Sequence, residues 1–137
     1  MMGRHELREQ VFRLLFRAEF QTIDDMPQQV RLFLEGSEEL VNETDANAVS
    51  QRYEKIQGKI PELDKLINEN IEGWDTNRIG KVELTVLRLA VFEILFDENI
   101  PNSVAIDEAV EIAKTYGQEN SGGFVNAILA KFVKTGD

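Results

Sequence analysis

Two arginines and two phenylalanines recur at helical spacing near the start of the chain. Arg4 and Arg8 are four residues apart, and Phe12 and Phe16 continue the same spacing. Residues four positions apart lie on one face of an α-helix, so these side chains would form a row. Arginine neutralises phosphates, and aromatic rings stack on unpaired bases. The row is therefore a candidate surface for nucleic acid.

The same helix also has a purely structural interpretation. Both phenylalanines could belong to a broad apolar face, and the arginines could pair with glutamates four residues away. Taken alone, the helix favours this interpretation. Cations at a helix N-terminus oppose the helix dipole, however, so helix stability does not account for their position. We expect the centre of the apolar face to consist of Leu7, Val11, Leu14, Leu15 and Ala18.

The sequence lacks the residue sets of common catalytic and metal sites. It has no cysteine, and its single histidine is His5, close to the N-terminus. The stretch GQENSGG at residues 117–123 is only faintly similar to a phosphate-binding loop, because no lysine follows its glycines and no strand is expected before it. We therefore expect no enzymatic activity, no cofactor and no metal.

Composition and charge predict a globular protein of the cytoplasm. The 137 residues are 42% hydrophobic and 29% charged, and no apolar run reaches membrane-spanning length. The formal net charge is −10, yet residues 1–20 are slightly basic and the acidic excess lies mainly in residues 21–75. Nucleic-acid affinity would have to come from a local patch. The acidic region would suit a basic protein partner, or would serve only solubility.

Helical periodicity runs along nearly the whole chain and predicts an all-α fold, a compact bundle of about seven helices. We expect the helix over 82–96 to be the buried central one. Gly73–Gly80 would separate an N-terminal subdomain, about 1–75, from a C-terminal one, about 76–137. Thr44 or Asp45 would cap the third helix and Asn120 or Ser121 the last. The expected helices cover about residues 4–20, 27–40, 45–56, 61–71, 82–96, 103–116 and 123–133.

A set of short motifs runs in order through the C-terminal half. They are Trp74 with Arg78, LTVLRLA at 84–90 followed by Glu93, IP at 100–101, VAIDEAV at 104–110, AK at 113–114 with Tyr116, and Ser121 followed by FVN at 124–126. In their order and spacing they resemble the NusB family of bacterial transcription antitermination factors. The arginine-bearing first helix is similar to that family as well.

The resemblance implies an all-α fold of two helical subdomains and a non-enzymatic role in RNA binding. Proteins of this family pair with NusE, a small-subunit ribosomal protein. The pair binds the boxA element of nascent RNA and joins the antitermination complex of RNA polymerase during ribosomal RNA transcription. These partners are what the resemblance implies for the present chain.

The resemblance also implies functional positions. It implies an RNA surface made of Arg4, His5, Arg8, Phe16, Lys114, Asn120, Ser121 and Phe124. We expect its N-terminal and C-terminal parts to adjoin. Glu83 and Phe16 would face the protein partner. Trp74, Arg88, Glu93 and Asn126 also match family positions, and we expect structural roles for them. Arg88 and Glu93 interrupt an apolar helix, so each should have a buried partner.

Three alternatives stay open at this point. The chain could be a helical protein-interaction module that does not bind RNA, with Arg4 and Arg8 as surface charge. It could be a fragment of a ribosomal RNA methyltransferase, some of which carry a NusB-like domain. A homodimer is also compatible with the sequence. Because the basic patch is small, we expect weak RNA binding alone and tighter binding with the partner.

Overall fold

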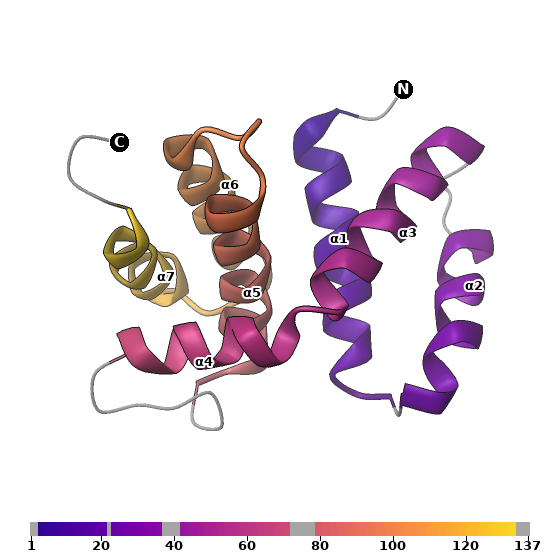
Figure 1. Ribbon diagram of the computed structural model, residues 1–137, viewed down its shortest axis with the longest axis horizontal. Coiled ribbons are helices and arrows are strands. Elements are labelled where there is room, and N and C mark those ends of the chain that lie inside the picture. Colours follow the sequence, from indigo (N-terminus) through magenta and orange to yellow (C-terminus); the bar gives the residue numbers. More distant parts are fainter. Residues whose placement is uncertain (1–2, 22, 37–41, 72–78, 134–137) are drawn as a thin grey trace. The chain divides into compact units, whose positions relative to one another are not determined.

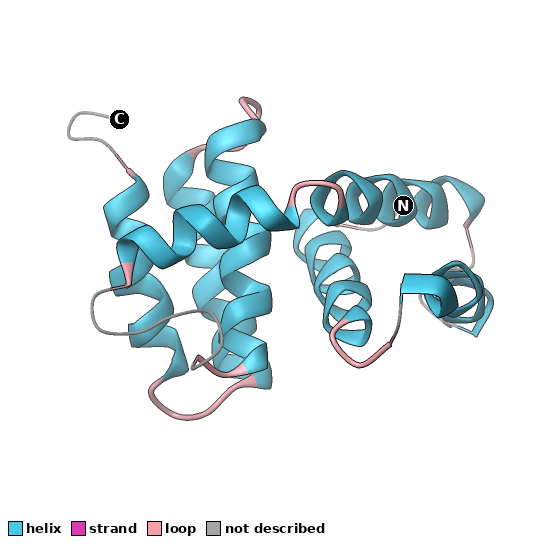
Figure 2. Ribbon diagram, turned by 60° about the horizontal axis from the view of Figure 1, so that its bottom comes forward, coloured by secondary structure: helices cyan, strands magenta, loops and turns pink. Residues whose placement is uncertain are grey.

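The computed structural model describes residues 3–21, 23–36, 42–71 and 79–133. Over these ranges the chain forms helices and no strand (Figure 2), which confirms the all-α class. The elements in order are α1 (Arg4–Ala18), η1 (Ile23–Asp25), α2 (Met26–Gly36), α3 (Glu43–Gln57), α4 (Ile60–Asn70), α5 (Lys81–Phe96), α6 (Asn102–Tyr116), α7 (Ser121–Leu129) and η2 (Ala130–Phe132).

The helix ends agree with the sequence prediction to within a few residues, and one cap differs. Asn42, not Thr44 or Asp45, is the N-cap of α3, because its Oδ1 accepts a hydrogen bond from the Thr44 N–H at 2.7 Å. α6 ends before Gly117, as predicted, and Asn120 precedes α7 at the N-cap position but makes no side-chain capping hydrogen bond there. The predicted stop at Gly73 lies outside the described residues.

The first compact unit spans residues 1–58 and contains α1, α2 and α3 (Figure 1). α1 packs on α2 and on α3. Val11, Leu14 and Leu15 of α1 are buried, as the apolar pattern predicted, and so are Val49 and Ile56 of α3. Their spacing of three and four residues gives each helix one apolar face, and burial of these faces holds the unit together.

The second compact unit spans residues 59–137 and is built on α5. Every side chain from Leu84 to Glu93 is buried. α4, α6 and α7 all pack on α5, and α6 also packs on α7 (Figure 1). A helix surrounded by three others must be apolar on nearly all faces, so the prediction of a buried central helix at 82–96 is confirmed.

An ion pair joins α4 to α5. Arg88 is only 8% exposed, and its Nε and Nη2 donate to Asp64 Oδ1 and Oδ2, each at 2.8 Å. Burial lowers the pKa of the Arg88 guanidinium and raises the pKa of the Asp64 carboxyl to about 6. Asp64 is thus the partner that the sequence required for Arg88. Glu93 is also buried, and it too takes part in an interaction within the protein.

The boundary between the two units lies after Gly58 rather than near residue 75. The sequence placed the fourth helix in the N-terminal subdomain because a glycine-containing segment follows it. In the structure α4 packs on α5 and carries Asp64, so it belongs to the second unit. Trp74 and Arg78 lie outside the described residues.

Candidate nucleic-acid interface

A pocket of about 340 Å³ lies at the start of α7 in the second unit. Four residues that the resemblance singled out line it together, namely Glu83, Asn120, Ser121 and Phe124. The sequence had assigned Glu83 to a protein partner and the other three to RNA. The remaining lining residues, which the sequence did not single out, are Ile79, Gly80 and Gln118.

The hydroxyl of Ser121 is the centre of the polar contacts in this pocket. It donates to Glu83 Oε1 at 2.7 Å and accepts from the Gln118 N–H at 2.8 Å. The Ser121 residue is only 1% exposed. Its side chain therefore anchors the turn between α6 and α7 to the first turn of α5, and it is not a free surface group.

Gly117 leaves the space that the Ser121 hydroxyl occupies. A Cβ atom at position 117 would lie 2.5 Å from Ser121 Oγ and 2.7 Å from the Ala113 carbonyl oxygen. Its φ of −99° is open to any residue, so the requirement for glycine is one of space. The sequence identified Gly117 as a helix stop, and the close approach of the Ser121 hydroxyl explains why glycine fits there.

Phe124 and Asn120 give the pocket groups suited to a nucleobase. The Phe124 N–H donates to the Asn120 carbonyl at 3.2 Å, which fixes their backbones in the first turn of α7. Asn120 is exposed and its side chain makes no capping bond. Phe124 is partly exposed. An aromatic face beside a free amide can stack on a base and bond to its edge.

Lys114 lies next to this helix start. A Cβ atom on Gly122 would come within 3.1 Å of Lys114 Cγ and 3.2 Å of its Cε, so the lysine stem crosses Gly122. Lys114 itself is exposed. Its stem packs on α7 while its ammonium stays in water, an arrangement that suits contact with a phosphate.

The three predicted basic residues of α1 differ in exposure. Arg4 is exposed. His5 is also exposed, with its Nε2 3.8 Å from Glu9 Oε2. Arg8 is only 8% exposed and interacts within the protein, so it is no surface cation. Arg4 and His5 are the accessible members of the predicted patch.

Phe16 is the middle ring of an aromatic series along α1. Its ring stacks on Phe12 at 5.8 Å between centroids and meets the edge of Phe20 at 5.2 Å. Phe12 is 1% exposed and belongs to the core, as the structural interpretation of the helix required. Phe20 is 59% exposed and continues the four-residue spacing of the series, although it was not among the predicted site residues.

The predicted RNA residues fall in both units. Arg4, His5, Arg8 and Phe16 lie in the first, and Lys114, Asn120, Ser121 and Phe124 in the second. The expectation that the two groups adjoin stays a prediction. The Asn126 side chain is exposed on α7, and the structural role expected for it also stays a prediction.

In the part of the chain that the structure describes, neither a metal-binding cluster nor a membrane-spanning helix occurs. There, no three histidine, aspartate or glutamate side chains lie close enough together to hold a metal ion. Each helix in these ranges is too short or too polar to span a bilayer.

Comparison with known proteins gives the family. The model of the NusB family matches residues 5–134. The chain belongs to the NusB family. The transcription antitermination protein NusB of Agathobacter rectalis is 46% identical over 133 residues, which cover 96% of this chain and 99% of that protein. The relatives that match this chain over 99% of their own length are transcription antitermination proteins, so the chain is a non-enzymatic antitermination factor of the NusB type.

Solved structures agree with this assignment. NusB of T. maritima superimposes with a TM-score of 0.85 at 38% identity, covering 98% of this chain and 92% of that chain. A chain in the crystal structure of a plectonemic RNA supercoil superimposes with a TM-score of 0.82 at 25% identity, covering 96% of this chain and 94% of that one. The NusB fold inferred from the sequence motifs is therefore confirmed.

Proposed function

We propose that this chain is a cytoplasmic, RNA-binding antitermination factor that pairs with NusE and binds boxA RNA. In this role it would join the antitermination complex of RNA polymerase during ribosomal RNA transcription. The observation that carries the proposal is the pocket at the start of α7, where Asn120, Ser121 and Phe124 lie together. The class of RNA and the partner are those that the resemblance of the sequence motifs to the NusB family implies.

Charge and family relatives support an RNA role. Lys114 beside the pocket and Arg4 on α1 provide exposed cations for phosphates, although the chain as a whole carries a net charge of −10. A basic ribosomal protein would complement that acidic excess. One structural relative at 25% identity comes from a crystal structure of an RNA supercoil.

A protein-interaction module without RNA binding is the second candidate, and the burial of Arg8 favours it. Arg8 is 8% exposed, so one of the two arginines of the predicted row is not available to a phosphate. A methyltransferase fragment is not favoured, because relatives that match over 99% of their own length are antitermination proteins.

Fluorescence anisotropy with labelled boxA RNA, with and without NusE, tests the proposal. We expect boxA RNA to bind more tightly than a scrambled RNA, and NusE to strengthen this binding. Replacing Phe124 with alanine should weaken it by about five- to a hundredfold, the range for loss of one base-stacking ring. Equal affinity for both RNAs with NusE present would contradict the proposal and favour the interaction module.

Phe96→Ala is the matched control for Phe124→Ala. Phe96 also lies in the second unit and is 38% exposed, but it is at the end of α5 and does not line the pocket. Its replacement should leave RNA affinity unchanged. If both variants lose affinity equally, the loss reflects general destabilisation of the second unit and not the pocket.

A further inference from the structure

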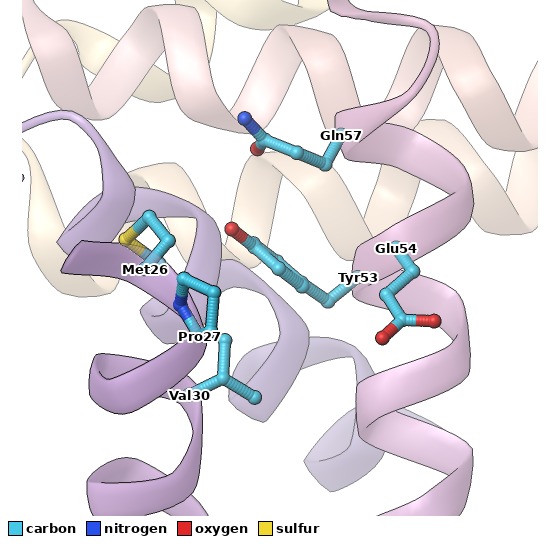
Figure 3. A pocket seen from close by; sticks show the side chains of 6 residues that line it. All are labelled: Met26, Pro27, Val30, Tyr53, Glu54 and Gln57. Atoms are coloured by element: carbon cyan, nitrogen blue, oxygen red, sulfur yellow. The ribbon is translucent and has the colours of Figure 1, made fainter. Parts of the chain in front are cut away.

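A second pocket, of about 360 Å³, lies between α2 and α3 in the first unit. It shares no residue with the pocket at the start of α7. One wall comes from Met26, Pro27 and Val30 of α2 (Figure 3). The other comes from α3, whose residues Tyr53, Glu54 and Gln57 line it. Its volume falls in the range of pockets that hold small molecules.

Most of this lining is apolar. Met26 and Tyr53 are buried, with 7% and 4% of their surfaces exposed, and Pro27 and Val30 complete the wall beside them. Such a lining favours a hydrocarbon chain or a flat ring. Such a lining disfavours a sugar or a free phosphate, because either would lose hydrogen bonds to water that the apolar side chains do not replace.

Gln57 leaves a hydrogen-bond acceptor unused at this pocket. Its Oε1 atom is buried and has no hydrogen-bond partner among the residues that the structure describes. Figure 3 shows the Gln57 amide and the Tyr53 hydroxyl directed from α3 toward α2. A buried acceptor without a donor costs stability, and a ligand that brings an N–H group would remove that cost.

The charge at the pocket is negative. Glu54 is exposed and lines the edge of this pocket. Burial and, to a smaller extent, the Glu54 carboxylate raise the pKa of Tyr53, so its hydroxyl stays neutral and can donate. A carboxylate, a buried amide oxygen and an aromatic ring together favour a cation that carries N–H donors.

We propose that this pocket binds an amphipathic organic cation, in which an apolar or aromatic group carries a protonated amine or a guanidinium. The apolar group lies against Met26, Val30 and Tyr53. The cation donates to Gln57 Oε1 and faces Glu54. A free small amine and the arginine side chain of a peptide both have this chemistry, and the experiment distinguishes them.

Titrations of the ¹⁵N-labelled full chain, followed by two-dimensional NMR, test the proposal. The probes are phenethylamine, blocked arginine amide, and the neutral control 2-phenylethanol. We expect saturable shifts at Tyr53, Gln57 and Met26 with a millimolar Kd for at least one cation, and binding of 2-phenylethanol at least tenfold weaker. The tighter of the two cations identifies the source. No saturation by either cation, or equal binding of 2-phenylethanol, would overturn the proposal.

Two variants separate binding from folding. Gln57→Leu removes the unused acceptor, so we expect an unchanged or higher Tm together with about tenfold weaker cation binding. Glu54→Gln should weaken binding severalfold. The matched controls are Gln51→Leu on the exposed surface of α3 and Glu35→Gln on that of α2, which should bind as the unmodified chain does. Unchanged affinity in Gln57→Leu would also overturn the proposal.

Discussion

At the scale of single residues, the hydroxyl of Ser121 has the largest structural consequence for the candidate site. It joins Glu83 of α5 to the Gln118 N–H in the turn before α7. The resemblance assigned Ser121 to RNA and Glu83 to a protein partner. The sequence could not pair them, because Glu83 and Ser121 are 38 positions apart and meet only through the packing of α5 against α7.

Replacing Ser121 with alanine should destabilise the chain by about 1–3 kcal/mol, since the Gln118 N–H and the Glu83 carboxylate lose a partly buried hydrogen-bond partner. RNA affinity should fall with it, because the turn that holds Asn120 loses its anchor. Urea unfolding and anisotropy measure the two effects. Thr115→Ala is the control, since its exposed hydroxyl bonds only the Glu111 carbonyl of the same helix. Equal stability losses in both variants would contradict the anchoring role.

Glu83→Gln distinguishes anchoring from partner contact. The amide oxygen of glutamine still accepts a hydrogen bond, so the fold and RNA binding should persist. A loss confined to NusE affinity would support the partner role that the resemblance assigned to Glu83.

At the scale of elements, the sequence predicted helices well and their partners less well. Each helix shows its apolar face in its own residues, so α5 was recognised as central from its composition alone. The cap of α3 was missed because Asn42, Thr44 and Asp45 are all good capping residues. The unit boundary was misplaced because the pattern of α4 gives its apolar face but not the helix on which that face packs.

The Arg88–Asp64 pair should be essential to the packing of α4 on α5. Arg88→Met leaves Asp64 without its bidentate partner in a partly dehydrated site, and we expect a loss of about 3–5 kcal/mol in the free energy of unfolding. Arg88→Met combined with Asp64→Leu removes both charges and should recover most of that loss. Urea unfolding of both variants measures this. A double variant no more stable than Arg88→Met would show that shape and not charge pairing holds the two helices.

At the scale of the whole molecule, charge and basic sites are unequally distributed. The chain carries a net charge of −10, and of the predicted basic residues Arg4, His5 and Lys114 are exposed while Arg8 is buried. The exposed basic side chains can therefore neutralise only a few RNA phosphates. The sequence indicated this small patch, but it could not show the burial of Arg8, which depends on tertiary packing.

We accordingly expect RNA binding by the isolated chain to depend weakly on salt. Three phosphate contacts to single-stranded RNA would give a slope of about −2 in a plot of log K against log salt concentration. Arg4→Gln should make the slope shallower by about 0.7. The control, Arg31→Gln on the exposed side of α2, should not change it. Anisotropy titrations at several salt concentrations provide the slopes, and a slope steeper than about −4 would contradict this count of contacts.

The contact of Ser121 with Glu83 and Gly117 also bears on how such sequences diverge. The Ser121 hydroxyl donates a hydrogen bond to the Glu83 carboxylate. It also lies so close to position 117 that a Cβ atom there would clash with it. A lineage that lost the serine would lose the reason to keep Glu83, while the Ala113 carbonyl oxygen would still require glycine at position 117. Positions 83 and 121 should therefore change together among natural relatives, as one inherited pair that spans two helices far apart in the sequence.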